Sequence, residues 1–113
     1  MLKRENRIRS KKEFAEIRNE GRVLYSPLFG FLTCKKDDDL KKFGFIVSKK
    51  ISKKAVDRNR IRRLLAEIVR KNFEKFENGT RVVFLTKQEI LGKKYEEVER
   101  EINKFLISND KKR

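Results

Sequence analysis

The feature that most constrains this chain is the stretch 48–71, which is both strongly basic and periodic. It reads SKKISKKAVDRNRIRRLLAEIVRK. An apolar stripe recurs there at spacings of three and four, and it consists of Ile61, Leu64, Leu65, Ile68 and, one turn on, Asn72. This spacing predicts an amphipathic helix with one face against a core. We expect Asp57 to cap its N-terminus, where a carboxylate suits the helix dipole.

The other faces of this predicted helix are cationic. The stretch holds ten lysines or arginines against two acids, so it carries eight of the fifteen net positive charges. The face opposite the stripe consists of Asn59, Arg63, Ala66 and Arg70, with Arg58 and Arg62 on one flank and Arg60 on the other. A solvated charged face normally includes acids at a spacing of four. Guanidinium groups without such acids indicate a surface that binds phosphate.

Length and charge narrow the class of protein further. A chain of 113 residues is long enough for one domain with a modest core. A net charge of +15 calls for a polyanionic partner: nucleic acid, an anionic membrane surface or an acidic protein. No apolar run is long enough to span a membrane, and the N-terminal residues MLKRENRIRS lack the apolar core of a signal peptide. We therefore expect a cytoplasmic protein without a membrane partner.

The sequence contains few residues that could carry chemistry. It has no histidine and one cysteine, Cys34, which excludes a disulfide within the chain and the usual zinc spacings. A lone cysteine without histidine is interpreted as a buried strand residue. The acids at 37–39 lack the spacing of a metal loop and predict a solvated turn. We predict no catalytic residue, no metal ligand and no cofactor bound by the protein itself.

The remaining patterns predict the other elements. Before the basic helix, these are a basic extended segment at 1–9 anchored by Ile8, a helix from the capping box Ser10–Glu13 to Gly21, and strands at 23–25, 28–34 and 43–48. After it come a strand at 81–86, a turn at 87–91, a helix at 94–108 and a loose charged tail at 109–113. The segment 35–42 is interpreted as a hairpin loop. This order predicts a single α+β domain, a small sheet with helices on one face. For a parallel pair, base rates favour a right-handed crossover through the basic helix.

A specific motif follows the strand at 43–48. Ser48-Lys49-Lys50 is followed, after a short basic loop, by Ala55-Val56-Asp57-Arg58-Asn59-Arg60-Ile61-Arg62-Arg63. This run resembles the signature of the protein subunit of bacterial ribonuclease P. Phe14 matches an aromatic position of that family's first helix, and the length, element order, charge and lack of histidine fit over nearly the whole chain.

The resemblance implies a fold and a function. The family fold is like domain 2 of ribosomal protein S5: a mixed sheet of about four strands with a left-handed βαβ crossover, which reverses the base-rate expectation. From the resemblance we expect this chain to be a cofactor subunit of an endoribonuclease that removes the 5′ leader from precursor tRNA. In that family a catalytic RNA holds the Mg²⁺ ions and cleaves. The protein is expected to bind that RNA and the single-stranded 5′ leader, to raise substrate affinity and to assist Mg²⁺ binding at the RNA active site.

Residue by residue, the resemblance and the helix faces give two predicted sites. The RNA-binding set is Lys49, Lys50, Arg58, Asn59, Arg60, Arg62, Arg63 and Arg70. The leader cleft is Phe14, Arg18, Leu32, Arg58, Asn59 and Arg62. The chain departs from some members at Arg18 and Leu32, where they have aromatic residues, and at Ala66, where they have arginine.

Two alternatives remain at this stage. A structural RNA- or DNA-binding protein would carry the same charge, because phosphate neutralisation is independent of sequence. A self-sufficient protein nuclease would need histidine or a metal site built from clustered carboxylates, and the sequence shows neither.

Overall fold

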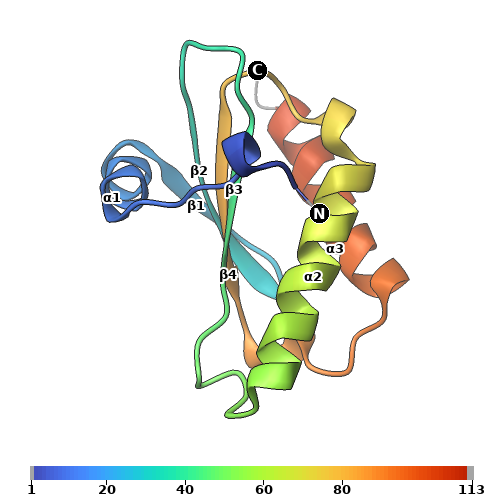
Figure 1. Cartoon of the computed structure of the whole chain (residues 1–113). Helices are drawn as coiled ribbons and strands as arrows, with labels where there is room; N and C mark the ends of the chain where they lie inside the picture. The colour runs from blue at the N-terminus through green and yellow to red at the C-terminus, as the bar shows by residue number, and fades with distance from the viewer. Residues whose placement is uncertain (1, 112–113) are drawn as a thin grey trace.

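The computed structural model describes the backbone of residues 2–111 and the side chains of residues 2–106 (Figure 1). The strands are β1 (Arg22–Tyr25), β2 (Phe29–Lys35), β3 (Lys42–Ile46) and β4 (Thr80–Thr86). The helices are α1 (Lys11–Glu20), α2 (Ala55–Lys71) and α3 (Tyr95–Lys111), with short 3₁₀ turns η1 (Arg4–Asn6), η2 (Phe73–Lys75) and η3 (Gln88–Ile90). The predicted α+β class, with a small mixed sheet, is confirmed. No helix within residues 2–111 is long and apolar enough to cross a membrane.

The four strands form one sheet in the order β1-β2-β4-β3. β4 is antiparallel to β2 and parallel to β3. The hairpin predicted around residues 35–42 is therefore wrong, because β4 lies between the two strands that this segment connects. The reason is in β4 itself: Val82 and Phe84 point to one face, Val83 to the other, and all three are fully buried. A strand that is apolar on both faces belongs in the middle of a sheet.

The connection from β3 through α2 to β4 joins parallel neighbours. In Figure 1, β3 runs downward at the front of the sheet, α2 returns upward on the right, and β4 runs downward behind β3. This path is left-handed, as the resemblance implied and against the base-rate expectation. One consequence is that the loop after β3 and the N-terminus of α2 meet at one end of the sheet.

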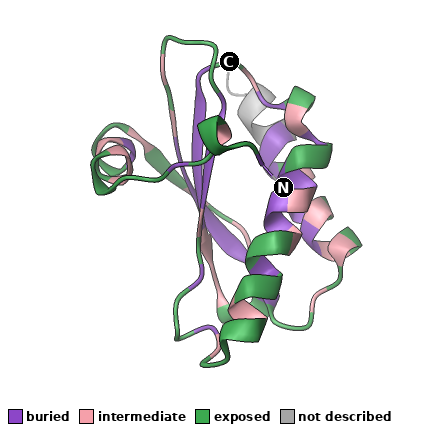
Figure 2. Ribbon diagram, in the orientation of Figure 1, coloured by how far each residue is buried: buried purple, intermediate pink, exposed green. Residues whose placement is uncertain are grey.

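The main core lies between the sheet and the helices α2 and α3 (Figure 2). Phe29, Phe31 and Phe84 meet edge to face, with ring centroids 4.9–5.7 Å apart. Phe31 also stacks on Phe105 of α3 at 4.1 Å. The predicted stripe of α2 is confirmed, because Ile61, Leu65 and Ile68 are at most 2% exposed and Leu64 is partly buried. Asn72, which caps the C-terminus of the helix, is also buried, and Val69 joins the buried face.

The first helix does not share that face. α1 packs on the opposite side of the sheet, where Ile8, Ile17, Leu32 and Val83 form a second, smaller apolar cluster (Figure 1). The expectation that the helices lie on one face is corrected for α1. The strands alternate apolar residues to both sides, so the second face also needs cover.

Local details of the helices also differ from expectation. The capping box of α1 is confirmed, since Ser10 Oγ accepts from the Glu13 backbone N–H at 3.1 Å. Asp57 is not the cap of α2, because the helix begins at Ala55 and the Asp57 carboxylate accepts from Ser52 Oγ at 2.9 Å. Ala66, predicted to lie opposite the stripe, is buried, because α2 packs against α3 as well as the sheet.

Both chain ends are more structured than predicted. The N-terminal segment contains the turn η1, and Leu2 is buried in addition to the expected anchor Ile8. Arg7 bridges to Phe43 and extends the edge of β3. The tail predicted at 109–113 begins as helix, because α3 continues to Lys111; the rest of that prediction, residues 112 and 113, lies outside the described residues.

Candidate nucleic-acid interface

The loop after β3 and the N-terminal half of α2 form a cationic surface at one end of the sheet. Of the predicted RNA-binding residues, Arg58 is half-buried, and the exposed ones are Lys49, Lys50, Asn59, Arg60, Arg62, Arg63 and Arg70. In Figure 2 the lower turns of α2 are exposed on their outer side and buried toward the sheet. The amphipathic pattern therefore turns these side chains to solvent while the stripe holds the helix.

Two arginines fix the loop to the helix. Arg58 Nη1 donates to the Ser52 carbonyl at 2.8 Å. Arg62 Nη2 donates to the Val47 carbonyl at 3.3 Å, and its Nη1 donates to Asn59 Oδ1 at 3.1 Å. A guanidinium has five donor hydrogens, so both groups keep donors for a phosphate. These hydrogen bonds hold the backbone of the loop against the helix before RNA binds.

Carboxylates are unevenly distributed along α2. Near its C-terminus Arg70 pairs with Glu67, and that hydrogen bond lowers the pKa of Glu67 below its ordinary value. Among the described residues, none of the eight lysines and arginines at positions 49–63 forms an ion pair with a carboxylate. The uncompensated charge therefore lies at the N-terminal half of α2. Arg70 is exposed, yet it is already paired within the protein.

The residues predicted as a leader cleft come from two sides of the sheet. Phe14, Arg18 and Leu32 lie on the α1 side, whereas α2, which packs on the other side, contributes Arg58, Asn59 and Arg62. The loop that follows Ile46 leads from β3 to α2. Arg18 is exposed and Phe14 is half-buried, but Leu32 is only 8% exposed beneath α1. Leu32 therefore offers almost no surface of its own.

Phe14 owes its position to a glycine and an ion pair. Gly44 of β3 lies beneath the ring: a Cβ added there would come within 3.2 Å of two ring carbons. Next to it, Lys42 Nζ binds Glu13 Oε2 at 2.8 Å and ties the first turn of α1 to β3. The absent side chain and the ion pair together hold the aromatic ring at the β3 edge of this face.

The register divides the α1 face into two rows that cross all four strands. The row under α1 consists of Val23, Leu32, Val83 and Gly44. The next row, which we call the open row, consists of Tyr25, Gly30, Leu85 and Ile46. Its two ends are exposed, Tyr25 by 77% and Ile46 by 39%, whereas Leu85 is half-buried and Gly30 is buried. In the row under α1, Val23 at the β1 edge is also 41% exposed.

Sequence reasoning did not identify the open row. The alternation in Arg22–Tyr25 was available: Leu24 packs against the main core, so Val23 and Tyr25 must face the other side. The sequence did not reveal how far α1 extends over this face of the sheet.

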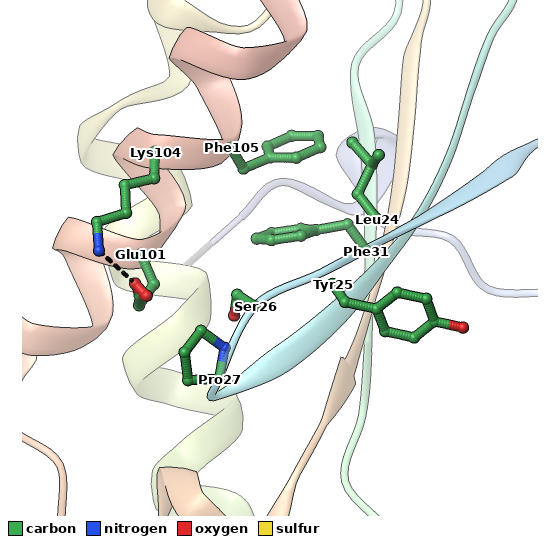
Figure 3. A pocket seen from close by; sticks show the side chains of 8 residues that line it. All are labelled: Leu24, Tyr25, Ser26, Pro27, Phe31, Glu101, Lys104 and Phe105. Atoms are coloured by element: carbon green, nitrogen blue, oxygen red, sulfur yellow. Dashed lines mark ion pairs between the residues drawn. The ribbon is translucent and has the colours of Figure 1, made fainter.

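A cavity of about 290 Å³ lies on the opposite face, between β1 and α3 (Figure 3). Phe31 and Phe105 form its apolar wall, and Glu101 and Lys104 face each other 3.3 Å apart at its rim. A buried carboxylate at the rim does not suit a phosphate ligand. Among the side chains of residues 2–106, no group of three or more histidine, cysteine or acidic residues could hold a metal ion.

Comparisons with known proteins agree with this geometry. The family model for Ribonuclease P matches residues 2–109. The ribonuclease P protein component of Syntrophus aciditrophicus is 33% identical over 105 residues, which cover 93% of this chain and 87% of that protein. The ribonuclease P protein from Thermotoga maritima superposes with a TM-score of 0.80 at 26% identity, over 88% of this chain and 94% of that chain.

A Staphylococcus aureus RNase P protein has the same fold, with a TM-score of 0.81 at 22% identity over 92% of this chain and 94% of that chain. The family model covers nearly the whole sequence, including the basic loop and α2. The chain therefore belongs to the ribonuclease P protein family, whose members are subunits of the endoribonuclease that processes precursor tRNA.

Proposed function

We propose that this chain binds the catalytic RNA of ribonuclease P through the loop after β3 and the N-terminal half of α2. The observation that carries this proposal is the group of eight cations at positions 49–63 that no described carboxylate pairs, because Asp57, the one acid among them, is bonded to Ser52. Cations without carboxylate partners attract phosphates at the lowest cost, since no ion pair has to be broken first. Lys49, Lys50, Arg58, Asn59, Arg60, Arg62 and Arg63 are the proposed contacts, with Arg70 at the margin because of Glu67.

We further propose that the single-stranded 5′ leader of precursor tRNA lies on the α1 side of the sheet. Phe14 and the open row give an apolar and aromatic floor, and Arg18 adds positive charge at its border. Such a floor suits a strand of varied sequence, because every base has a face that can stack or pack. Arg58, Asn59 and Arg62 would meet the leader where it turns around the β3 edge. Leu32 lies in the neighbouring row on the same face, beneath α1, and contributes little surface to this floor.

The proposed effect on catalysis is indirect. The RNA holds the Mg²⁺ ions, and the protein contributes by holding the leader so that the scissile phosphate stays at the RNA active site. Binding energy gained from the leader raises affinity for the precursor over mature tRNA, which has no leader to bind. Fixing the phosphate also assists Mg²⁺ binding there. We propose that this role in precursor tRNA cleavage is carried out in the cytoplasm.

The test is cleavage of a precursor tRNA by a bacterial ribonuclease P RNA at limiting Mg²⁺, with and without this protein. A large protein-dependent gain that disappears when the leader is trimmed to one nucleotide supports both parts of the proposal. A gain that does not depend on the leader removes the leader site and keeps the RNA-binding role. Tight general nucleic-acid binding without any gain would favour a structural RNA-binding protein instead.

A further inference from the structure

Tyr25 is the most exposed aromatic residue of the sheet, 77% accessible at the end of β1. Its ring lies beside Gly30, where an added Cβ would meet Tyr25 Cδ1 at 3.7 Å. Leu85 lies next in the same row, at 3.8 Å from that point. The ring thus extends an apolar floor that begins with Ile46 on the far strand. Packing in the core does not explain why this position holds an aromatic residue, since little of the side chain's area is removed from water.

A lysine is fixed beside that ring. Lys87 Nζ lies 5.6 Å from the Tyr25 ring centroid and donates to the Ser26 carbonyl at 2.9 Å. The turn is rigid in its own right, because Ser26 Oγ accepts from the backbone N–H groups of Leu28 and Phe29 at 3.2 Å. An ammonium has three donor hydrogens, so Lys87 keeps two for an outside acceptor. Ring and cation are therefore positioned before any ligand arrives.

We propose that Tyr25 and Lys87 form a second nucleotide-binding position for single-stranded RNA, in which the ring stacks on a base and the ammonium contacts a phosphate. This proposal rests on the leader site proposed above. Charge complementarity selects the occupant: an exposed ring with a lysine nitrogen over it, 5.6 Å from the ring centroid, on a chain of net charge +15, favours a polyanion with aromatic bases over an apolar protein surface.

The register also fixes how long a leader must be to use this position. Tyr25 and Ile46 lie on opposite edge strands of the four-stranded sheet. Adjacent strands are about 4.8 Å apart, so the row spans about 14 Å. A stacked strand advances about 3.4 Å per nucleotide and needs about four nucleotides to cross it. A leader that enters at the β3 edge therefore reaches Tyr25 only when it is longer than that.

The experiment measures the affinity of holoenzyme, reconstituted with a bacterial ribonuclease P RNA, for precursor tRNA with a leader of one nucleotide or of about ten. The variants are Tyr25→Ala, Tyr25→Phe and, as a control, Leu40→Ala, a residue 40% exposed in the loop that leads into the other end of β3. We expect Tyr25→Ala to weaken binding of the long leader by about 5- to 150-fold, the effect of removing one stacking aromatic. Binding of the short leader and the melting temperature should match wild type in all these variants, and Tyr25→Phe and Leu40→Ala should also bind the long leader as wild type does.

Lys87→Gln tests the cation separately. Glutamine keeps a donor for the Ser26 carbonyl and loses the charge, so the dependence of log Kd on log salt should fall by about 0.7 for the long leader only. If wild type distinguishes the two leaders and Tyr25→Ala does so equally well, this position is refuted and the leader site stands. If wild type does not distinguish them, both proposals fail together.

Discussion

Replacing Leu65 by alanine tests the assignment of the two faces of α2. Leu65 is 0% exposed, and its equally well covered neighbours on the helix, each at most 2% exposed, are Ile61, Ile68 and Val69. Three buried carbons are lost, which costs about 2.4 kcal/mol in transfer free energy at about 0.8 kcal/mol per carbon. The cavity adds to this, because no surface side chain can move in to fill it. We expect the free energy of unfolding to fall by about 3–5 kcal/mol, within the upper range for such truncations.

Thermal unfolding followed by circular dichroism measures this effect. For 113 residues the unfolding entropy corresponds to about 4 °C per kcal/mol, so the melting temperature should fall by about 12–20 °C. Val56→Ala is the matched control, since Val56 lies in the first turn of the same helix and is 73% exposed. Its effect should stay within about 0.5 kcal/mol.

RNA affinity separates packing from binding. Measured well below both melting temperatures, the affinity of Leu65→Ala for the catalytic RNA should equal that of wild type, because the stripe faces the core. Equal melting temperatures for Leu65→Ala and Val56→Ala would refute the assignment of the buried face. A loss of RNA affinity in the folded Leu65 variant would refute the separation of the two faces.

Two further predictions follow from side-chain contacts. Arg58→Ala and Arg63→Ala should both weaken RNA binding. Only Arg58→Ala should also lower the free energy of unfolding, by about 1 kcal/mol, because it removes the hydrogen bond to the Ser52 carbonyl. Equal melting temperatures of the two variants would contradict this. The hydrogen bond from Lys42 lowers the pKa of Glu13 below its ordinary value of 4.5, so this pair stabilises the fold at neutral pH and the contribution is lost as the pH falls below that value. Glu13→Gln should therefore be less stable than wild type in urea at pH 7 and about equal to it near pH 2, and a gap that persists in acid would exclude this origin.

Local patterns in the sequence predicted much of this fold. The spacing of Ile61, Leu65 and Ile68 identified the buried face of α2, and Ser10 with Glu13 identified the start of α1. These two predictions are correct because helix periodicity and capping depend on residues within one or two turns. The same holds for the unpaired cations, which are visible as a scarcity of acids nearby in the sequence.

Features that depend on distant residues were not predictable in this way. Nothing near residues 35–42 indicates that β4, some forty residues later, separates the two strands that this segment connects. The burial of Leu32 and the exposure of Tyr25 both depend on how far α1 extends across the sheet. The number of residues in α1 does not reveal that limit. The predicted cleft residues therefore include Leu32, which is covered, and the sequence did not reveal that Tyr25 is exposed.

The central position of β4 has a consequence for how this protein emerges during synthesis. Both apolar clusters require it, since Val82 and Phe84 complete one and Val83 the other. A nascent chain that has released only residues up to about 75 therefore has no closed core, although its basic helix is already exposed. The sheet can close only through contacts between distant parts of the chain, which makes folding slower than for a helical bundle of this size. Until then, repulsion among the lysines and arginines opposes collapse. An RNA that neutralises these charges would therefore favour folding of the protein that it binds.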